Sequence, residues 1–264
     1  MNKNAEESSV IESTLLVNGI LLFYVAAGSG IPVLYLHGNL GSSLWYSRVM
    51  DLAGCRTVAV ELPNFGRSEP MPGEVDLDRY ADFLAAFIEE ADLDRPVLVA
   101  HSLGGAVAQS LAARRPELIR SLVLVDSAPP SGLRTPEERY PAIELMRTDK
   151  GILASALRTV VPFLSDEAFF ASLVMDAQKM AGPAWIGNAR ALSGFDYSLN
   201  LGAFDKSVLV LRGNRDRIVT EAMARETAAA FPRARLEILE DVGHSPMVED
   251  PARFKEILSS FIAE

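Results

Sequence analysis

Short apolar runs alternate with longer amphipathic stretches along most of the chain. Five runs, rich in β-branched residues, barely alternate with polar positions, which is typical of strands buried on both faces of a parallel sheet; they lie at residues 32–36, 57–62, 97–100, 122–125 and 208–211. Apolar residues recur at helical spacing between or after these runs, at residues 78–91, 103–115, 221–231 and 252–262. This alternation predicts a doubly wound α/β fold with a mostly parallel sheet and right-handed crossovers.

Both ends of the predicted sheet carry an alternating pattern instead. Residues 14–17 and 20–26 flank the pair Asn18-Gly19. An Asn-Gly pair between two β-rich runs predicts a hairpin, so we expect an antiparallel N-terminal edge. Residues 236–239 also alternate, which indicates a further strand at an edge.

One long stretch contains no convincing strand but several helical segments. Within residues 129–204, helical patterns lie at about 136–146, 151–160, 166–180 and 185–192. We interpret this stretch as a helical cap, or lid, over the carboxyl ends of the strands, where open α/β sheets bind ligands. The alternative is a helical insertion whose apolar residues merely pack together. Residues 1–128 and 205–264 would then form the core domain.

Composition and charge narrow the classes of partner. The 264 residues are 49% apolar and 23% charged, enough for one sizeable core, and the formal net charge is −10. That charge repels nucleic acid and anionic lipid, so we expect neither as a partner. Residues 1–16 lack the basic start and apolar run of a secretory signal, and no apolar stretch reaches membrane-spanning length. With Cys55 as the single cysteine, no intramolecular disulfide can form. We therefore expect a cytoplasmic protein with no membrane insertion, and its oligomeric state stays open.

The candidate nucleophile is Ser102. Residues 97–105 (VLVAHSLGG) describe a strand that ends in a sharp turn and opens a helix. The small residues Ala100 and Gly104 bracket Ser102, as such a turn requires because neighbouring backbone passes close to it. Gly105 would let the helix pack tightly on adjacent strands. The turn would lift the hydroxyl clear of the sheet, at a helix N-terminus that favours developing negative charge.

A serine hydroxyl needs a base, and the chain contains only three histidines. His101 adjoins Ser102 on a strand end and should point the other way, as a packing residue. His37 directly follows a strand, where we expect it to shape a turn. His244 lies in a loop between the last predicted strand and the terminal helix. Such a loop can bring an imidazole over the sheet, so His244 is the expected base.

An acid must orient the imidazole and stabilise its charged form. Asp216 lies in a loop just after a buried strand and is the expected acid. Asp126, at the end of the strand next to that of the nucleophile, is the alternative. Asp205 precedes a strand and ranks below both. For the oxyanion hole, we expect the backbone N–H groups of Leu103 and of Asn39, the residue after His37-Gly38.

At these residues the chain resembles the α/β-hydrolase superfamily over nearly its whole length. The matching motifs are Leu36-His37-Gly38-Asn39, residues 61–68 (ELPNFGRS), the turn around Ser102, and Asp216 with Gly243-His244. The resemblance implies the α/β-hydrolase fold, a triad in the chain order Ser102, Asp216, His244, and a lid between the sixth and seventh strands. Glu61 and Asn64 replace the usual Asp and Gly of the second motif, which would alter the shape of that loop.

The subfamily is less defined. His37-Gly38-Asn39 resembles the haloalkane dehalogenases, but those enzymes and the epoxide hydrolases use an aspartate nucleophile, and this chain has Ser102. The members of the superfamily that use a serine nucleophile remain as alternatives: carboxylesterases, lactonases, carbon–carbon bond hydrolases of ring-cleavage pathways, and perhydrolases.

We expect a serine hydrolase that cleaves an ester or lactone through an acyl-enzyme, without metal or organic cofactor. Apolar cap residues suggest a small-to-medium hydrophobic substrate; they are Phe163, Phe169, Phe170, Met175, Met180 and Trp185. The alternatives are a carbon–carbon hydrolase with the same triad and a slow-turnover ligand receptor on the same scaffold.

Overall fold

A computed structural model describes residues 10–264, and the first nine residues, part of the segment expected to carry no secretory signal, lie outside the described residues. Eight strands form one sheet in the order β1-β2-β4-β3-β5-β6-β7-β8. Their bounds are Ile11–Val17 (β1), Ile20–Gly28 (β2), Ile31–Leu36 (β3), Cys55–Val60 (β4), Val97–His101 (β5), Ser121–Val125 (β6), Val208–Gly213 (β7) and Ala234–Leu239 (β8). β2 pairs antiparallel with β1 and β4, and all other pairs are parallel. The predicted antiparallel N-terminal edge and mostly parallel sheet are confirmed, and β8 is an edge strand, as its alternation indicated.

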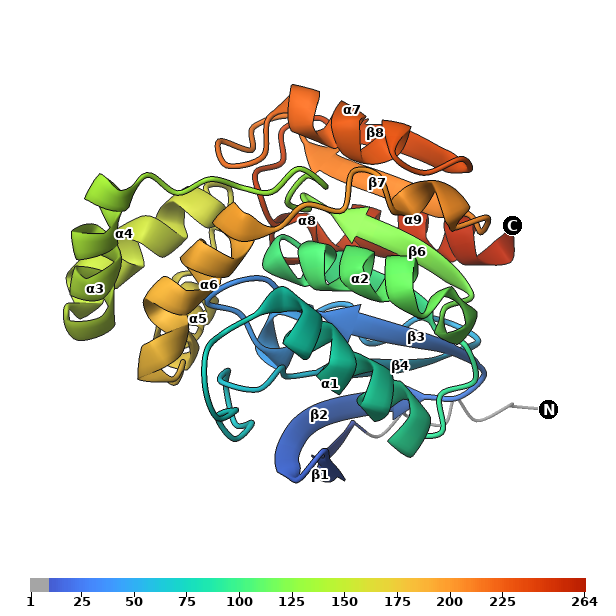
Figure 1. Ribbon diagram of the computed structural model, residues 1–264, viewed down its shortest axis with the longest axis horizontal. Coiled ribbons are helices and arrows are strands. Elements are labelled where there is room, and N and C mark those ends of the chain that lie inside the picture. The colour runs from blue at the N-terminus through green and yellow to red at the C-terminus, as the bar shows by residue number, and fades with distance from the viewer. Residues whose placement is uncertain (1–9) are drawn as a thin grey trace.

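Helices cover both faces of this sheet (Figure 1). In that view α1 and α2 lie in front of the strands and α9 lies behind them. The core helices are α1 (Leu77–Glu90), α2 (Leu103–Arg114), α7 (Glu221–Ala229), α8 (Pro246–Glu249) and α9 (Pro251–Ala263). The short helix α8 was not predicted, because four residues are too few to show a helical period.

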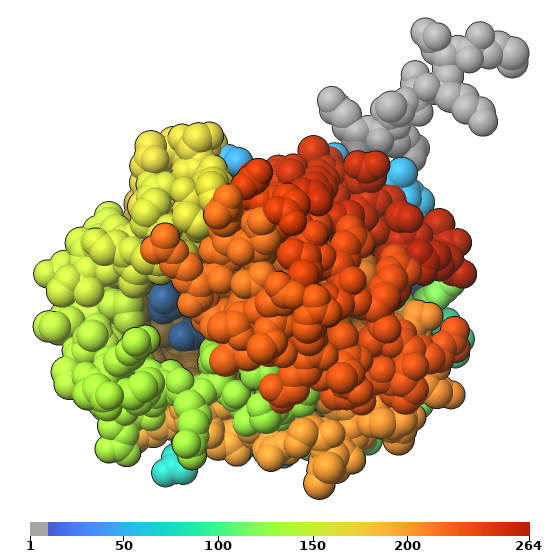
Figure 2. Space-filling view, turned by 90° about the horizontal axis from the view of Figure 1, so that it is seen from above, coloured from blue at the N-terminus to red at the C-terminus, as the bar shows by residue number. Residues whose placement is uncertain are grey.

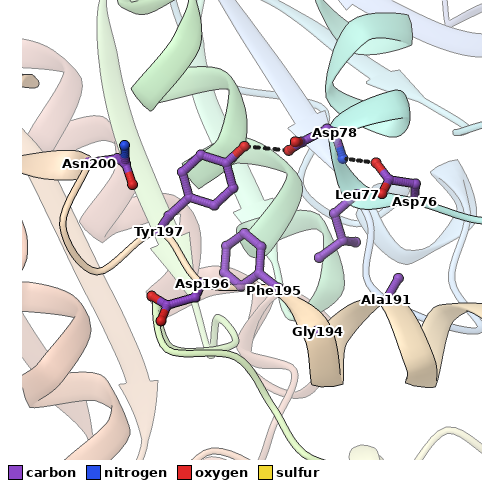
Figure 3. Close-up of a pocket in the computed structure, with 9 residues that line it drawn as sticks. All are labelled: Asp76, Leu77, Asp78, Ala191, Gly194, Phe195, Asp196, Tyr197 and Asn200. Atoms are coloured by element: carbon purple, nitrogen blue, oxygen red, sulfur yellow. Dashed lines mark hydrogen bonds between the residues drawn. The ribbon is translucent and has the colours of Figure 1, made fainter.

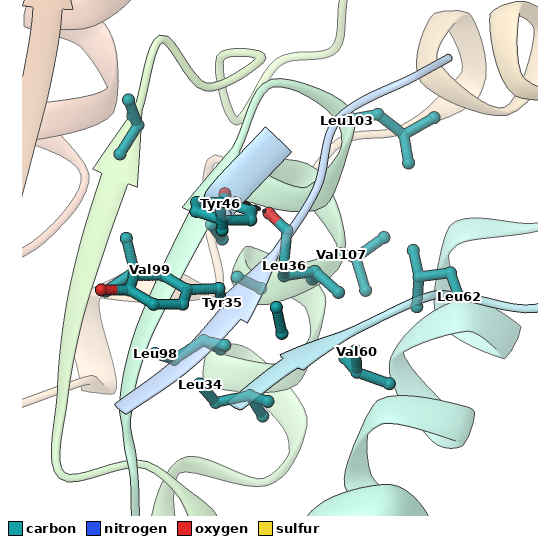
Figure 4. Packing of buried hydrophobic residues seen from close by; sticks show 14 of the residues in the cluster. Leu34, Tyr35, Leu36, Tyr46, Val60, Leu62, Leu98, Val99, Leu103 and Val107 are labelled. Atoms are coloured by element: carbon teal, nitrogen blue, oxygen red, sulfur yellow. Dashed lines mark hydrogen bonds between the residues drawn. The ribbon is translucent and has the colours of Figure 1, made fainter. Parts of the chain in front are cut away.

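The centre of the sheet is buried on both sides. All five residues of β5 are buried, because helices cover both faces of the sheet at this strand. Its backbone hydrogen bonds are made with β3 on one side and β6 on the other. Figure 4 shows side chains of β3, β4 and β5 packed beside Leu103 and Val107 of α2. Tyr46 closes this cluster by donating its hydroxyl to the carbonyl oxygen of Leu36 at 2.9 Å. The carboxyl end of β3, which leads into His37, is thereby held in place.

The cap, by which we mean residues 129–204, follows β6 and precedes β7. Its helices are α3 (Tyr140–Thr148), α4 (Lys150–Val160), α5 (Glu167–Ala177) and α6 (Gly182–Gly194), close to the predicted segments. In Figure 1 they lie together on the side toward which the arrows of β3 and β6 point. α3 buries none of its side chains, whereas α6 buries Ala184, Trp185, Asn188, Ala189 and Leu192. Among residues 10–264 no helix combines the length and apolarity needed to cross a bilayer.

The apolar cap residues singled out from the sequence divide into two groups. Phe170, Met180 and Trp185 are buried, and Phe169 is half-buried. Phe163 and Met175 are 47% and 59% exposed, so these two do not belong to a closed apolar interior.

The turn between β5 and α2 is strained. Ser102 has φ 53° and ψ −115°, a region that residues with a side chain rarely adopt. Residue 104, in the first turn of α2, has to be glycine. A Cβ there would lie 2.9 Å from the carbonyl oxygen of Leu36 and would overlap the carbonyl oxygen of His37. This close approach is the one that the small residues around Ser102 predicted.

We therefore expect Gly104→Ala to destabilise the protein by about 1–3 kcal/mol, the usual cost of overpacking. Thermal and urea denaturation would measure the loss. Gly194→Ala, at the end of α6, is the matched control, because its Cβ would enter open space. Equal stability of the two variants would contradict this account of the turn.

Candidate active site

Three loops at the carboxyl edge of the sheet bring Ser102, Asp216 and His244 together. Ser102 lies between β5 and α2, Asp216 follows β7, and His244 follows β8. His244 Nε2 lies 2.9 Å from Ser102 Oγ, and His244 Nδ1 lies 2.7 Å from Asp216 Oδ2. The side chains of His244 and Asp216 are 3% and 0% exposed, so this hydrogen-bonded chain is shielded from water. Each of these residues was a site prediction from the sequence.

Asp216 is built to stay ionised. Burial by itself raises the pKa of this carboxyl, but the interaction with His244 and further hydrogen bonds outweigh it and hold the pKa below its ordinary value. Asp216 Oδ1 accepts the backbone N–H groups of Ile218 and Val219 at 2.7 and 3.2 Å. A carboxylate next to Nδ1 requires the proton on that nitrogen, which leaves the Nε2 lone pair facing the hydroxyl of Ser102.

The loops that carry Asp216 and His244 are joined by backbone hydrogen bonds. The N–H of Asn214 donates to the carbonyl of Leu239 at 2.8 Å, and that of Arg215 donates to Val242 at 2.9 Å. The acid and the imidazole are therefore held by a continuation of the β7–β8 pairing rather than by two independent loops.

Asp126, the alternative acid, lies beside this pair but faces another group. Its Oδ1 accepts the N–H of Gly213 at 3.0 Å. Burial raises the pKa of Asp126 well above its ordinary value, and the neighbouring Asp216 raises it further. The same residues also resemble a metal site, because atoms of the kind that bind metals lie within 4.8 Å of one another in Asp126, Asp216 and His244. Nδ1 of His244, however, is already hydrogen-bonded to Asp216. Asp205 precedes β7, at the opposite end of that strand from the site.

The loop after β3 passes directly beside the nucleophile. A Cβ on Gly38 would lie 2.9 Å from Cβ of Ser102, so only glycine allows this approach. His37 fixes the loop, because its Nδ1 lies 2.9 Å from the carbonyl oxygen of Gly38 and its Nε2 accepts the N–H of Leu62 at 3.1 Å. Burial lowers the pKa of His37 to about 4, so the ring is neutral and able to accept. His37 thus shapes the turn, the role expected for it.

Two backbone amides near Ser102 are available to a ligand. The N–H of Leu103 belongs to the first residue of α2 and has no carbonyl of the same helix to bond. The N–H of Asn39 donates to no protein acceptor within residues 10–264. These are the two amides expected for an oxyanion hole.

His101 does more than pack. It was expected to point away, yet its ring centroid lies 4.8 Å from that of His244, and its Nε2 lies 2.8 Å from the backbone carbonyl oxygen of His244. Burial lowers the pKa of His101 well below its ordinary value, so the ring is neutral, and Nε2–H donates to that carbonyl. His101 therefore holds the loop of His244 through its backbone.

The two departures from the family pattern in residues 61–68 have structural roles. Buried Glu61 accepts hydrogen bonds from Ser43 Oγ at 2.6 Å and from the N–H of Arg67 at 2.5 Å, which ties the loop together. Asn64 adopts the left-handed conformation that glycine favours, with φ 76°. Its side chain also contacts Tyr80, and Tyr80 contacts Asn188. No sequence pattern singled out Tyr80 or Asn188, because each belongs to an ordinary helical period.

The surface is hollowed between the cap and the core (Figure 2). In that view the hollow lies between the green and yellow cap and the orange C-terminal part, with blue atoms of the N-terminal part at its base. A separate pocket of about 440 Å³ lies where α1 begins and the cap ends (Figure 3). There Asp76 accepts the N–H of Asp78 at 2.8 Å, and Tyr197 bonds to the Asp78 carboxylate. Asp76 therefore caps the start of α1, and Asp78 joins that helix to the cap.

The chain is similar to several known proteins over most of its length. One relative, a dihydrolipoyllysine-residue acetyltransferase component of an acetoin cleaving system from Cupriavidus necator, is 30% identical over 93% of this chain and 67% of its own length. A 2-hydroxymuconate semialdehyde hydrolase from a Pseudomonas species is 27% identical over 98% of this chain and 96% of its own. A solved structure from Burkholderia cenocepacia, of a protein assigned as an aryl esterase, superposes with a TM-score of 0.84 and 28% identity over 96% of this chain and 98% of that one.

Residues 33–257 match the model of the alpha/beta hydrolase family. This match includes most of β3, the strands β4 to β8, the cap and the three loops that carry Ser102, Asp216 and His244. The chain belongs to the alpha/beta hydrolase family.

Proposed function

We propose that this protein is a serine hydrolase that cleaves a carboxylic ester or a lactone, with Ser102, His244 and Asp216 as its catalytic triad. The observation that carries the proposal is the buried chain from Asp216 through His244 to Ser102, with bonds of 2.7 and 2.9 Å. The likeness to a protein assigned as an aryl esterase supports the ester-cleaving alternative.

In the first half of the reaction, Ser102 Oγ attacks the carbonyl carbon while His244 Nε2 takes the hydroxyl proton. The carbonyl oxygen becomes an oxyanion, and the N–H groups of Asn39 and Leu103 donate to it. The positive end of α2 adds to this stabilisation, since Ser102 is its N-cap. The imidazolium then gives its proton to the departing alkoxide, and the acyl group stays on Ser102.

In the second half, water takes the place of the alcohol. His244 removes a proton from the water as it attacks the acyl carbon, and the same two amides stabilise the second oxyanion. Protonation of Ser102 Oγ by His244 releases the acid. All of these groups belong to the chain, so the proposed reaction needs no metal or organic cofactor.

For the substrate we propose a small-to-medium hydrophobic ester or lactone. The hollow between the cap and the core supports the binding of a substrate there (Figure 2). The cap also buries two aromatic side chains, Phe170 and Trp185.

A second candidate, cleavage of a carbon–carbon bond with the same triad, is favoured by one observation. The relative that is 27% identical over nearly the full length of both chains is a 2-hydroxymuconate semialdehyde hydrolase. Efficient turnover of a ring-cleavage product with poor turnover of nitrophenyl esters would select this candidate. A ligand-induced rise in Tm with negligible hydrolysis of any substrate would instead select a receptor.

We expect Ser102→Ala to lower kcat for a nitrophenyl ester by a factor on the order of 10⁶, because no nucleophile remains. A fluorophosphonate probe should label the wild-type protein at Ser102 and leave the variant unlabelled. Ser127→Ala removes another buried serine hydroxyl at the end of a neighbouring strand and is the control. Full ester hydrolysis by Ser102→Ala would refute the proposal.

We expect Asp216→Asn to lower kcat by about 10⁴, since an amide cannot hold the required tautomer of His244. Asp126→Asn should have a far smaller effect, because Asp126 accepts the Gly213 N–H rather than a bond from His244, and the amide oxygen of asparagine can accept the same N–H. Steady-state kinetics of both variants on one ester decides between the two acids. The reverse order of effects would assign the role to Asp126.

A further inference from the structure

A chain of buried polar side chains links the cap helix α6 to the loop that carries Asn39. Asn64 Nδ2 lies 2.9 Å from the hydroxyl oxygen of Tyr80, which lies 3.1 Å from Oδ1 of Asn188. Nδ2 of Asn188 in turn lies 2.8 Å from Oδ1 of Asn39. These residues come from the loop after β4, from α1, from α6 and from the loop after β3. The chain therefore crosses from the core to the cap and back to the active site.

The direction of every hydrogen bond in this chain follows from one backbone amide. The N–H of Met71 can only donate, and it lies 3.1 Å from the Asn64 side-chain oxygen, so Nδ2 of Asn64 faces Tyr80. The hydroxyl oxygen of Tyr80 then accepts, and its proton is directed to Asn188. Oδ1 of Asn188 accepts that proton, which leaves Nδ2 to donate to Asn39. The orientation of all three amide groups is thereby determined.

Burial makes this chain costly to rearrange. Tyr80 and Asn188 are fully buried and Asn64 is 3% exposed, whereas Asn39 at the far end is half-buried. Breaking one bond would leave a buried donor or acceptor without a partner, at about 1–3 kcal/mol. A backbone hydrogen bond of 2.8 Å, from Ala181 N–H to the carbonyl of Asn64, anchors α6 to the same loop just before the helix begins. Asn188 is thus a fixed point rather than a freely moving cap residue.

The Asn39 loop needs such an anchor. The next residue, Leu40, has φ 62°, a strained conformation for a leucine, and Gly41 N–H closes a tight turn onto the Gly38 carbonyl at 3.1 Å. His37 holds the residues before Asn39, and the bond from Asn188 holds the Asn39 side chain. An oxyanion donor acts well only when its N–H lies within a few tenths of an ångström of the required position.

We propose that Asn188 is a positioning residue for the backbone amide of Asn39, and that Tyr80 and Asn64 set the orientation of the Asn188 side chain. This inference rests on the proposed function, in which that amide stabilises the oxyanion. It means that the cap contributes to catalysis as well as covering the site, because the placement of α6 sets the aim of one oxyanion donor.

A double-mutant cycle tests the proposal. Asn188→Ala should lower kcat roughly 10- to 100-fold with little change in KM, less than the loss of an entire oxyanion donor. Asn39→Ala keeps the backbone amide but loses its anchor, so it should lower kcat by a similar factor. Because the two residues act through the same bond, the double variant should be no slower than the slower single variant.

Two further variants complete the design. Tyr80→Phe removes the donor to Asn188 and retains the ring, so it should lower kcat in the same direction, and this loss should vanish in the Asn39→Ala background. If Asn188→Ala does not fold, the Tyr80–Asn39 cycle decides. Ser193→Ala is the matched control on α6. It loses a bond from the Thr135 N–H, which does not belong to the series of hydrogen bonds from Asn64 to Asn39, and its kcat should equal that of wild type.

The outcomes separate the inference from the proposed function. Multiplicative losses in the double variant, a change in KM alone, or a lower Tm with unchanged kcat would each overturn the positioning role of Asn188. Ester hydrolysis that survives Ser102→Ala would overturn the proposed function instead. An enzyme that depends on Ser102 but tolerates Asn188→Ala keeps the function and refutes the inference.

Discussion

The turn at Ser102 is the constraint on which the rest of the site depends. Its left-handed backbone places the hydroxyl above the sheet and directs the first amides of α2 toward the same space. Such a conformation is stable only where the surroundings determine it fully. Here the central strands hold one side of the turn, and the close passage of α2 over the loop after β3 holds the other. The loop after β3 then has to lie beside Ser102, which brings the Asn39 amide to the site.

Around this turn, chemically similar groups have pKa values that are shifted in different directions. Asp216 receives N–H donors and the imidazole, and its pKa is lowered, whereas the pKa of Asp126 next to it is raised by burial. His37 and His101 are both held neutral by burial, and each uses its ring to fix a loop. Among the histidines, all of which lie within residues 10–264, only His244 has a carboxylate on one side and a serine hydroxyl on the other. Position within the buried edge of the sheet, rather than residue type, separates the proposed base, His244, from the two histidines that fix loops.

The cap is part of the same construction. Its outer helix α3 buries no side chain, while α6 sends Asn188 into a buried chain of hydrogen bonds that ends at Asn39. The departure of Asn64 from the family pattern has a physical meaning in this context. It retains the left-handed backbone of a glycine and adds an amide that orients Tyr80. The loop of residues 61–68, which the sequence indicated only to be altered in shape, is therefore linked by hydrogen bonds to the candidate active site.

Much of the fold and part of the site could be read from the sequence alone, because the relevant information is local. Strand and helix periods extend over a few residues, so the order of elements, the hairpin at Asn18-Gly19 and the helical cap were predictable. The turn at Ser102 is also a local pattern, and because the chain has only three histidines, His244 was the expected base. Only the tertiary structure decided which carboxyl faces His244, that His101 holds the loop of that residue, and that Asn188 reaches Asn39. These contacts join residues up to 149 positions apart, and their strength depends on burial and on the direction of single hydrogen bonds. Neither burial nor the direction of a single hydrogen bond produces a periodic pattern in the sequence, because each arises only when distant loops meet at the edge of the sheet.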